Sequence, residues 1–248
     1  MDWLKLSTTK IYSVYRRLFL EQCYVCHKSS KNTLCQHCHD NFPKNEKYCL
    51  RCKHPTHKTN TLCGRCQISP PKYQLCVAPY RFEGIIKTLI HSIKFNQGNH
   101  YIRPLIDLLS EHLIQAYSSD SWPDQLIYVP SHPNRIKERG FCQTKVMTHY
   151  LVKNLQQKIG DDCPYQTHSN PLNKLKHTQA QHSLSRKERL KNKKNTYNID
   201  KPVAKHVALF DDVMTTGSTI ESCTKLLLES GAERVDIWVI ARTPDKMN

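Results

Sequence analysis

The chain has 248 residues, of which 38% are hydrophobic and 23% are charged, a composition typical of a globular protein with one α/β core and a small accessory module. Its formal net charge of +16 favours nucleic acid or another acidic surface as a partner. No apolar run approaches the roughly 20 residues of a membrane-spanning helix, so we expect a protein that does not span a membrane. We expect a cytoplasmic protein, because Arg16-Arg17 is not followed by the apolar stretch and cleavage site of an export signal.

The N-terminal part of the chain predicts a short helix followed by a metal-binding module. Apolar residues recur at roughly helical intervals over residues 1–20, with Lys and Arg between them, which indicates an amphipathic helix. Four Cys-x-x-Cys pairs follow within residues 21–69, and this is the spacing of zinc sites rather than of a disulfide framework. The eight expected ligands are Cys23, Cys26, Cys35, Cys38, Cys49, Cys52, Cys63 and Cys66.

Four thiolates complete a tetrahedral Zn²⁺ site, so these pairs predict a double zinc-ribbon domain with two structural zinc ions. Sequential pairing along the chain is favoured, while pairing crossed between the two modules remains open. The remaining four cysteines are scattered, and we expect them to be small buried side chains. They are Cys76, Cys142, Cys163 and Cys223.

Residues 72–248 predict one domain that follows the Ser69-Pro-Pro71 linker. Strands are expected at residues 74–82, 125–129, 207–210 and 235–241, and helices at residues 85–93, 102–116, 147–159 and 220–228. Strands that alternate with helices in this way are typical of an α/β fold, in which helices flank a parallel sheet.

The strand expected at residues 207–210 leads into two acids and a hydroxyl-rich turn. Asp211 and Asp212 fall at its carboxyl end, where open α/β sheets bind ligands, and we expect both to face solvent. The turn combines hydroxyl groups and backbone N–H groups with the start of a helix, which suits a phosphate group. It consists of Thr215, Thr216, Gly217, Ser218 and Thr219. The paired acids suit sugar hydroxyls or a hydrated Mg²⁺.

This order of residues resembles the motif with which type I phosphoribosyltransferases bind phosphoribosyl pyrophosphate (PRPP). The resemblance implies that the turn anchors the 5′-phosphate of PRPP in the presence of Mg²⁺. It also implies that Asp211 and Asp212 are catalytic, since they would hold the ribose hydroxyls and oppose positive charge on the ring.

A second polar turn follows the strand at residues 125–129. Ser131, Arg135 and Arg139 predict a pyrophosphate loop, because a hydroxyl and two guanidinium groups gather at a strand end. The alternative is a basic loop that only caps the next helix.

Residues 172–194 are dense in Lys, Arg, Gln and His. Two interpretations have equal support: a basic lid that closes over bound phosphates, and a surface that neutralises the phosphates of nucleic acid. The residues expected to act in either role are Gln181, Lys187, Arg189, Lys191, Lys193 and Lys194.

Four motifs in this order are similar to those of the ComF (ComFC/GntX) family. They are the tandem Cys-x-x-Cys pairs, the stretch Arg139-Gly-Phe-Cys-Gln143, the PRPP motif, and the pattern Thr178, Gln181, Leu184, Arg189 and Asn192. The resemblance spans nearly the whole chain, although Cys142 stands where the family usually has Asn.

The resemblance implies a type I phosphoribosyltransferase fold preceded by a double zinc ribbon. It also implies a cytoplasmic role in natural competence, where the protein would handle incoming single-stranded DNA for transformation. Expected partners are PRPP, single-stranded DNA and proteins of the competence machinery. The alternative is an active phosphoribosyltransferase of nucleotide metabolism, which would transfer the phosphoribosyl group of PRPP to an unidentified nitrogen acceptor. Whether the chain is an enzyme stays open at this point.

Overall fold

The computed structural model describes residues 22–59, 61–95, 98–117, 121–160, 163–165, 170–175 and 196–244. The helix expected at residues 1–20 lies outside these ranges. So do six residues of the basic segment, namely Gln181, Lys187, Arg189, Lys191, Lys193 and Lys194. No helix in the described ranges is long and apolar enough to cross a membrane.

The chain forms two compact units, which meet in sequence between Phe42 and Pro43. This division falls between the two cysteine clusters, inside the range 21–69 expected for the zinc ribbons. The described part of the first unit contains one short helix, α2 (Gln36–Asp40). The second unit contains the other zinc ribbon, with α3 (Gly64–Ile68), and all strands of the main sheet.

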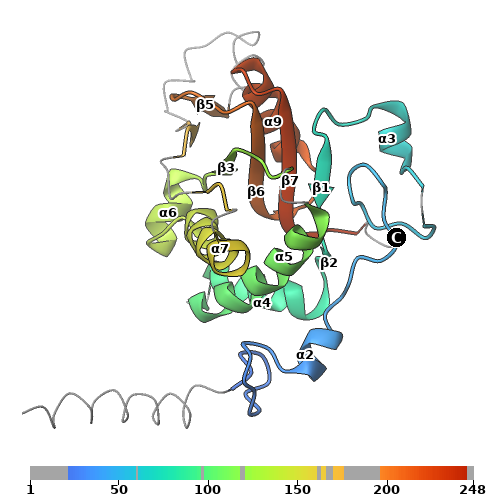
Figure 1. Ribbon diagram of the computed structural model, residues 1–248, viewed down its shortest axis with the longest axis vertical. Coiled ribbons are helices and arrows are strands. Elements are labelled where there is room, and N and C mark those ends of the chain that lie inside the picture. The colour runs from blue at the N-terminus through green and yellow to red at the C-terminus, as the bar shows by residue number, and fades with distance from the viewer. Residues whose placement is uncertain are drawn as a thin grey trace, which may run out of the picture. The chain divides into compact units, whose positions relative to one another are not determined.

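The main sheet of the second unit is parallel throughout. Its order is β1-β7-β6-β3, and β2 also pairs with β7 (Figure 1). The strands are β1 (Leu75–Val77), β2 (Tyr80–Arg81), β3 (Gln125–Tyr128), β6 (His206–Met214) and β7 (Arg234–Arg242). The single strand expected at residues 74–82 is wrong, because the ladder is interrupted at Pro79, which has no N–H to donate.

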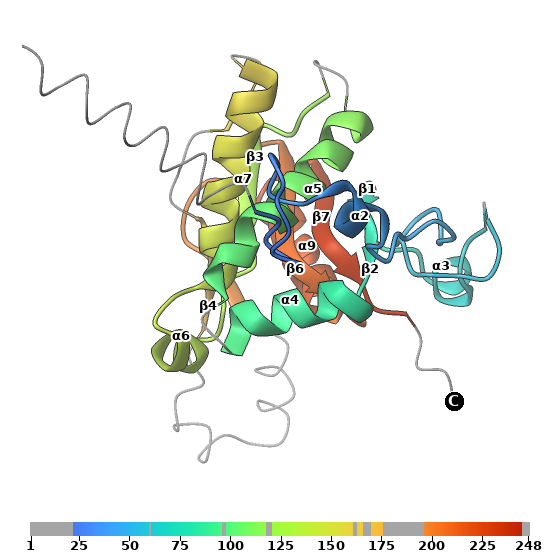
Figure 2. The same cartoon turned by 90° about the horizontal axis from the view of Figure 1, so that it is seen from below.

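Helices cover the sheet, and a small hairpin lies apart from it. The helices are α4 (Gly84–Phe95), η1 (Asn99–Tyr101), α5 (Ile102–Ala116), α6 (Pro133–Arg139), α7 (Gln143–Ile159) and α9 (Ser218–Glu229). The hairpin pairs β4 (Leu172–Lys174) with β5 (Tyr197–Ile199). Helices α4, α5 and α7 gather beside one another, while α9 runs along β6 and β7 (Figures 1 and 2).

Strand β6 is buried on both faces, as its unbroken apolar run predicts. Val207 and Leu209 belong to one core cluster with Ile220 and Leu227 of α9. Because side chains alternate along a strand, Ala208 and Phe210 point to the opposite face. The predicted α/β fold class, with a parallel sheet flanked by helices and preceded by zinc ribbons, is confirmed.

One polar cluster interrupts the apolar interior on the second face. Asp236 of β7 is completely buried and accepts hydrogen bonds from the Tyr117 hydroxyl at 2.9 Å and from Arg234 Nη2 at 2.9 Å. Its Oδ2 also lies 2.8 Å from His206 Nε2. Trp238 Nε1 donates to the Tyr117 oxygen at 2.9 Å. The carboxylate thus ties β6 and β7 to the end of α5.

Candidate phosphate site and zinc ribbons

The eight ribbon cysteines form two clusters in sequential order. One cluster joins Cys23, Cys26, Cys35 and Cys38, and the other joins Cys49, Cys52, Cys63 and Cys66. Within each cluster all sulfur atoms lie within 4.8 Å of one another. The sequential arrangement is therefore observed, and the crossed alternative is not.

The geometry of both clusters fits Zn²⁺. The sulfurs of Cys26 and Cys35 are 3.6 Å apart, and those of Cys52 and Cys63 are 3.7 Å apart. A tetrahedral ion with Zn–S bonds of about 2.3 Å requires sulfurs about 3.8 Å apart. Each cluster supplies four thiolates, so these are two structural zinc sites without an open position for water.

The two ribbons repeat one local design. The residue after the second cysteine of each first pair has a positive φ, 59° at His27 and 53° at Lys53. This tight turn brings backbone N–H groups toward the first sulfur. Burial raises the pKa of the Cys49 thiol, but backbone N–H groups of Cys52, Cys63 and Arg51 outweigh burial and lower that pKa to about 7.

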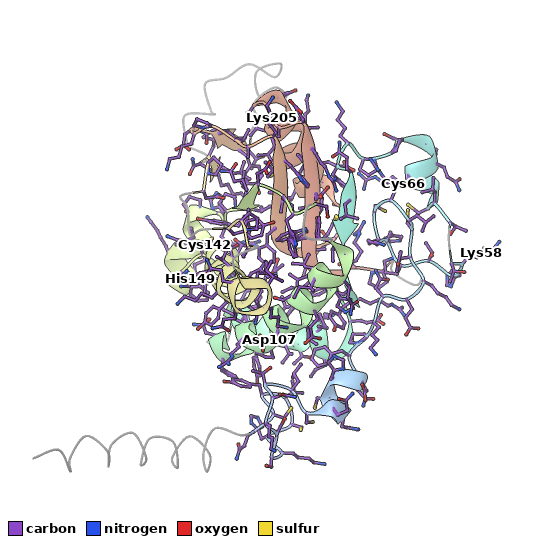
Figure 3. The ribbon with its side chains drawn as sticks, viewed as in Figure 1. Lys58, Cys66, Asp107, Cys142, His149 and Lys205 are labelled. Atoms are coloured by element: carbon purple, nitrogen blue, oxygen red, sulfur yellow. The ribbon has the colours of Figure 1, made fainter. Side chains whose placement is uncertain are left out.

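The second zinc cluster is part of the main core. Cys49, Cys52 and Cys66 belong to the same buried cluster as Val207 of β6 and Cys223 of α9. Figure 3 labels Cys66 among the sulfur atoms of this ribbon. Loss of metal from this cluster would therefore disturb the side of the sheet that α9 covers.

The turn between β6 and α9 has the geometry expected of an anion site. Gly217 caps the helix with φ 83°, a left-handed conformation that favours glycine. The Ser218 N–H points to the Thr216 hydroxyl at 3.4 Å, and the two hydroxyl oxygens lie 3.0 Å apart. Helix α9 then begins at Ser218, and the side chain at its N-cap position makes no capping hydrogen bond. The residues named for this turn from sequence thus lie together, and their role in binding PRPP stays a prediction.

The expectation that both acids face solvent at a strand end is wrong for Asp212. Strand β6 continues to Met214, and Asp212 is only 6% exposed. Its Oδ2 forms an ion pair with Lys94 Nζ at 2.5 Å and accepts a hydrogen bond from Gln143 Nε2 at 2.9 Å. These partners satisfy a carboxylate that would otherwise be buried without compensation.

Lys94 and Gln143 are site residues that sequence reasoning missed. Gln143 begins α7 and is the last residue of the stretch Arg139-Gly-Phe-Cys-Gln143. This motif could therefore have identified Gln143 from the sequence. Lys94 lies in the last turn of α4, and no local pattern distinguishes it from other lysines.

Asp211 points to the opposite face of β6. Its charge helps to raise the pKa of the Cys223 thiol on α9 and of the Tyr197 hydroxyl on β5. Burial raises the pKa of the Asp211 carboxyl well above its usual range, and the neighbouring Asp212 adds to this rise. A cationic ligand would reverse the effect, since positive charge nearby favours the ionised carboxylate.

The turn after β3 carries the three residues expected to bind pyrophosphate. Ser131 lies in the loop itself, while Arg135 and Arg139 are on α6, whose N-terminus is capped by the His132 ring. The Arg139 guanidinium lies over the Phe95 ring at 5.0 Å. Both interpretations of this turn, a pyrophosphate loop and a basic helix cap, are compatible with this arrangement.

A cavity of about 760 Å³ opens beside this turn. It is lined by Ser131, Lys145, His149 and Lys174 among others, and its described lining contains no acidic residue. The absence of acids and the presence of these basic groups suit an anionic ligand.

Cys142 and His149, both labelled in Figure 3, line the same cavity. Burial raises the pKa of the Cys142 thiol, but hydrogen bonds involving Thr144 and Ser131 outweigh burial, so the pKa is lowered. The prediction of small buried side chains is wrong for Cys142 and Cys163, which are only partly buried, whereas Cys76 and Cys223 are buried as expected.

Comparisons with known proteins identify the chain's relatives. A double zinc ribbon domain model matches residues 14–67. The DNA utilization protein YhgH of Salmonella typhi is 30% identical over 227 residues, which cover 89% of this chain and 96% of that protein. Competence protein F of Haemophilus influenzae is 31% identical over 221 residues, which cover 86% of this chain and 92% of that protein.

Among solved structures, a hypoxanthine phosphoribosyltransferase from Staphylococcus aureus covers 58% of this chain and 74% of its own. Its TM-score is 0.32 and its identity 14%, a similarity too low to bear on function. The relatives matched over nearly their full length show the family, and the chain belongs to the ComF family.

Proposed function

We propose that the turn between β6 and α9 binds the 5′-phosphate of PRPP with Mg²⁺, and that the protein acts in the handling of incoming single-stranded DNA in the cytoplasm. The observation that carries the first part is the left-handed Gly217 at the start of α9, directly after two acids on β6. Such a turn presents backbone N–H groups to a phosphate, and Asp211, which is only partly buried, is the acid proposed to hold the sugar.

A glycine substitution tests the phosphate site. Gly217→Ala places a side chain at φ 83°, a conformation that residues other than glycine rarely adopt, so the turn is strained although the new Cβ meets only an ordinary contact 3.6 Å from Met214 Sδ. Strain at such a position costs about 1–3 kcal/mol, so we expect the affinity for Mg²⁺·PRPP to fall about tenfold or more. Equilibrium dialysis with labelled PRPP measures this.

Gly231→Ala is the matched control, because Gly231 also has a positive φ of 107° but follows the other end of α9. It should cost similar backbone strain and leave the PRPP affinity unchanged. If both variants lost PRPP affinity to the same extent, the cause would be general destabilisation, and the Gly217→Ala result would no longer support the phosphate site.

Two observations favour the DNA-handling part of the proposal. The relatives carry names that refer to DNA utilization and competence. The chain also has a formal net charge of +16, and this net charge stays positive when eight thiolates bind two zinc ions. A positive protein attracts the phosphates of DNA.

The basic segment supplies a test of DNA binding. Replacing five of its residues with Gln should weaken single-stranded DNA binding for all sequences alike. The slope of the logarithm of the binding constant against the logarithm of the salt concentration should become shallower by roughly 0.7 for each DNA phosphate that is no longer neutralised. The residues are Lys187, Arg189, Lys191, Lys193 and Lys194. Fluorescence anisotropy over a series of salt concentrations measures both effects.

A charge-matched variant carries five Gln replacements at exposed lysines elsewhere. These are Lys87, Lys153, Lys201, Lys205 and Lys225. The same salt slope in both variants would mean that only overall charge matters. An intact salt slope together with weaker PRPP binding in the first variant would favour the lid interpretation of the segment.

The second candidate function is phosphoribosyl transfer to a nitrogen acceptor. The cavity of about 760 Å³ beside Ser131 favours it, since it offers space for an acceptor next to the expected pyrophosphate loop. Mg²⁺-dependent release of pyrophosphate from PRPP on addition of an acceptor would distinguish this function from binding alone.

A further inference from the structure

Two arginines hold the outer side of the turn between β6 and α9. Arg242, at the end of β7 and 4% exposed, donates to the Met214 carbonyl at 2.8 Å and to the Thr215 carbonyl. Arg65 donates to the carbonyl of Thr216, the next residue. Three successive carbonyls of the turn thus accept hydrogen bonds from arginine side chains. Because the N–H of a trans peptide points away from its C=O, the N–H groups of these three peptides are directed away from the arginines, which is where an anion would lie.

Arg65 comes from the second zinc ribbon. It stands in α3 between the zinc ligands Cys63 and Cys66, and Cys63 caps this helix. Its Nη2 forms an ion pair with Glu221 at 2.5 Å, in the first turn of α9. An ion pair this exposed contributes little stability by itself, but it fixes the orientation of the guanidinium group.

The ribbon and the turn face each other across a cavity. The cavity has a volume of about 620 Å³ and is lined by Cys63 and Arg65 on one side and by Thr216 and Gly217 on the other. The hydrogen bond from Arg65 spans this space. A second link runs through Arg242, whose Nε also donates to the Cys52 carbonyl at 3.4 Å. On the ribbon side, the first link starts at Arg65, between two zinc ligands, and the second ends at the carbonyl of the zinc ligand Cys52.

We propose that Arg65 is a positioning residue for the phosphate turn, and that zinc at the second cluster holds Arg65 where it can bind the Thr216 carbonyl. This rests on the proposed function, since it assumes that the turn binds a 5′-phosphate. With the carbonyl bound, the N–H groups of the turn are oriented before the phosphate arrives, so less conformational freedom is lost on binding. The second zinc ribbon thereby becomes a working part of the phosphate site.

The test measures ribose 5-phosphate binding to the zinc-loaded full chain by calorimetry. Arg65→Gln should weaken binding about tenfold, because a charge-assisted hydrogen bond is removed. Arg65→Lys should restore most of the affinity, since one ammonium group can serve the Thr216 carbonyl. Glu221→Gln removes only the ion pair and should change affinity by no more than about twofold. The unfolding midpoint should be the same in all three variants.

A second comparison links the effect to zinc. Cys63→Ser should lower both the zinc content and the affinity for ribose 5-phosphate, and adding Arg65→Gln to it should cause no further loss, because the two changes break one connection. If the unsubstituted chain fails to bind ribose 5-phosphate or PRPP, the proposed function itself fails. If the chain binds and Arg65→Gln binds equally well, or if Lys does not rescue, the positioning role is overturned while the phosphate site stands.

Discussion

Replacing Asp236 with Ala is expected to cost about 3–5 kcal/mol of unfolding free energy, because it leaves donors in the interior without their carboxylate. Asp236 is completely buried and receives hydrogen bonds from Tyr117 and Arg234, with His206 at 2.8 Å. Urea denaturation followed by tryptophan fluorescence suits this test, since Trp238 donates to the same network through Tyr117.

Glu233→Ala is the matched control for Asp236→Ala. Glu233 pairs with Lys205 near the same end of β7, but both side chains are about 70% exposed, at 69% and 73%. A pair this exposed contributes less than about 1 kcal/mol. Similar midpoints for the two variants would contradict a structural role for the buried carboxylate.

Replacing Asp211 and Asp212 together with Asn is expected to lower the affinity for Mg²⁺·PRPP by roughly one to two decades. The estimate follows from removing one charge-assisted hydrogen bond of about 1.5–3 kcal/mol, that of Asp211, because the buried Asp212 carboxylate is already held by Lys94 and Gln143. Stability should also fall, since Asp212→Asn leaves the Lys94 ammonium, whose side chain is 22% exposed, without its partner.

A further variant separates the two effects of the acid pair. Lys94→Met combined with Asp212→Leu removes both charges of the ion pair, so the fold should keep its stability better than with Asp212→Asn alone. PRPP affinity should still fall, because the carboxylate is gone. Calorimetry and urea denaturation on the same preparations give both quantities, and an unchanged PRPP affinity in these variants would exclude the acids from the site.

Local patterns predict much of this fold because the relevant interactions are local. The helix at residues 102–116 appears with the predicted bounds, since its apolar stripe is read directly from the sequence. The cysteine spacing likewise predicts two four-cysteine clusters, because each Cys-x-x-Cys pair closes within one tight turn.

Contacts between distant parts of the chain explain what local patterns miss. The predicted strand stops at Phe210 because two acids normally mark a strand end. The observed strand continues through Asp212, since Lys94, far away in sequence, neutralises its charge. Arg65 is another case: nothing near it in sequence shows that it binds the Thr216 carbonyl.

The most direct test of the account is a calorimetric titration of the unsubstituted, zinc-loaded chain with PRPP, with and without Mg²⁺. We predict saturable binding at one site per chain, stronger with Mg²⁺, and competition by ribose 5-phosphate, because the 5′-phosphate occupies the turn between β6 and α9. Absence of binding, or binding that ribose 5-phosphate does not displace, would contradict the assignment of this turn as the phosphate site.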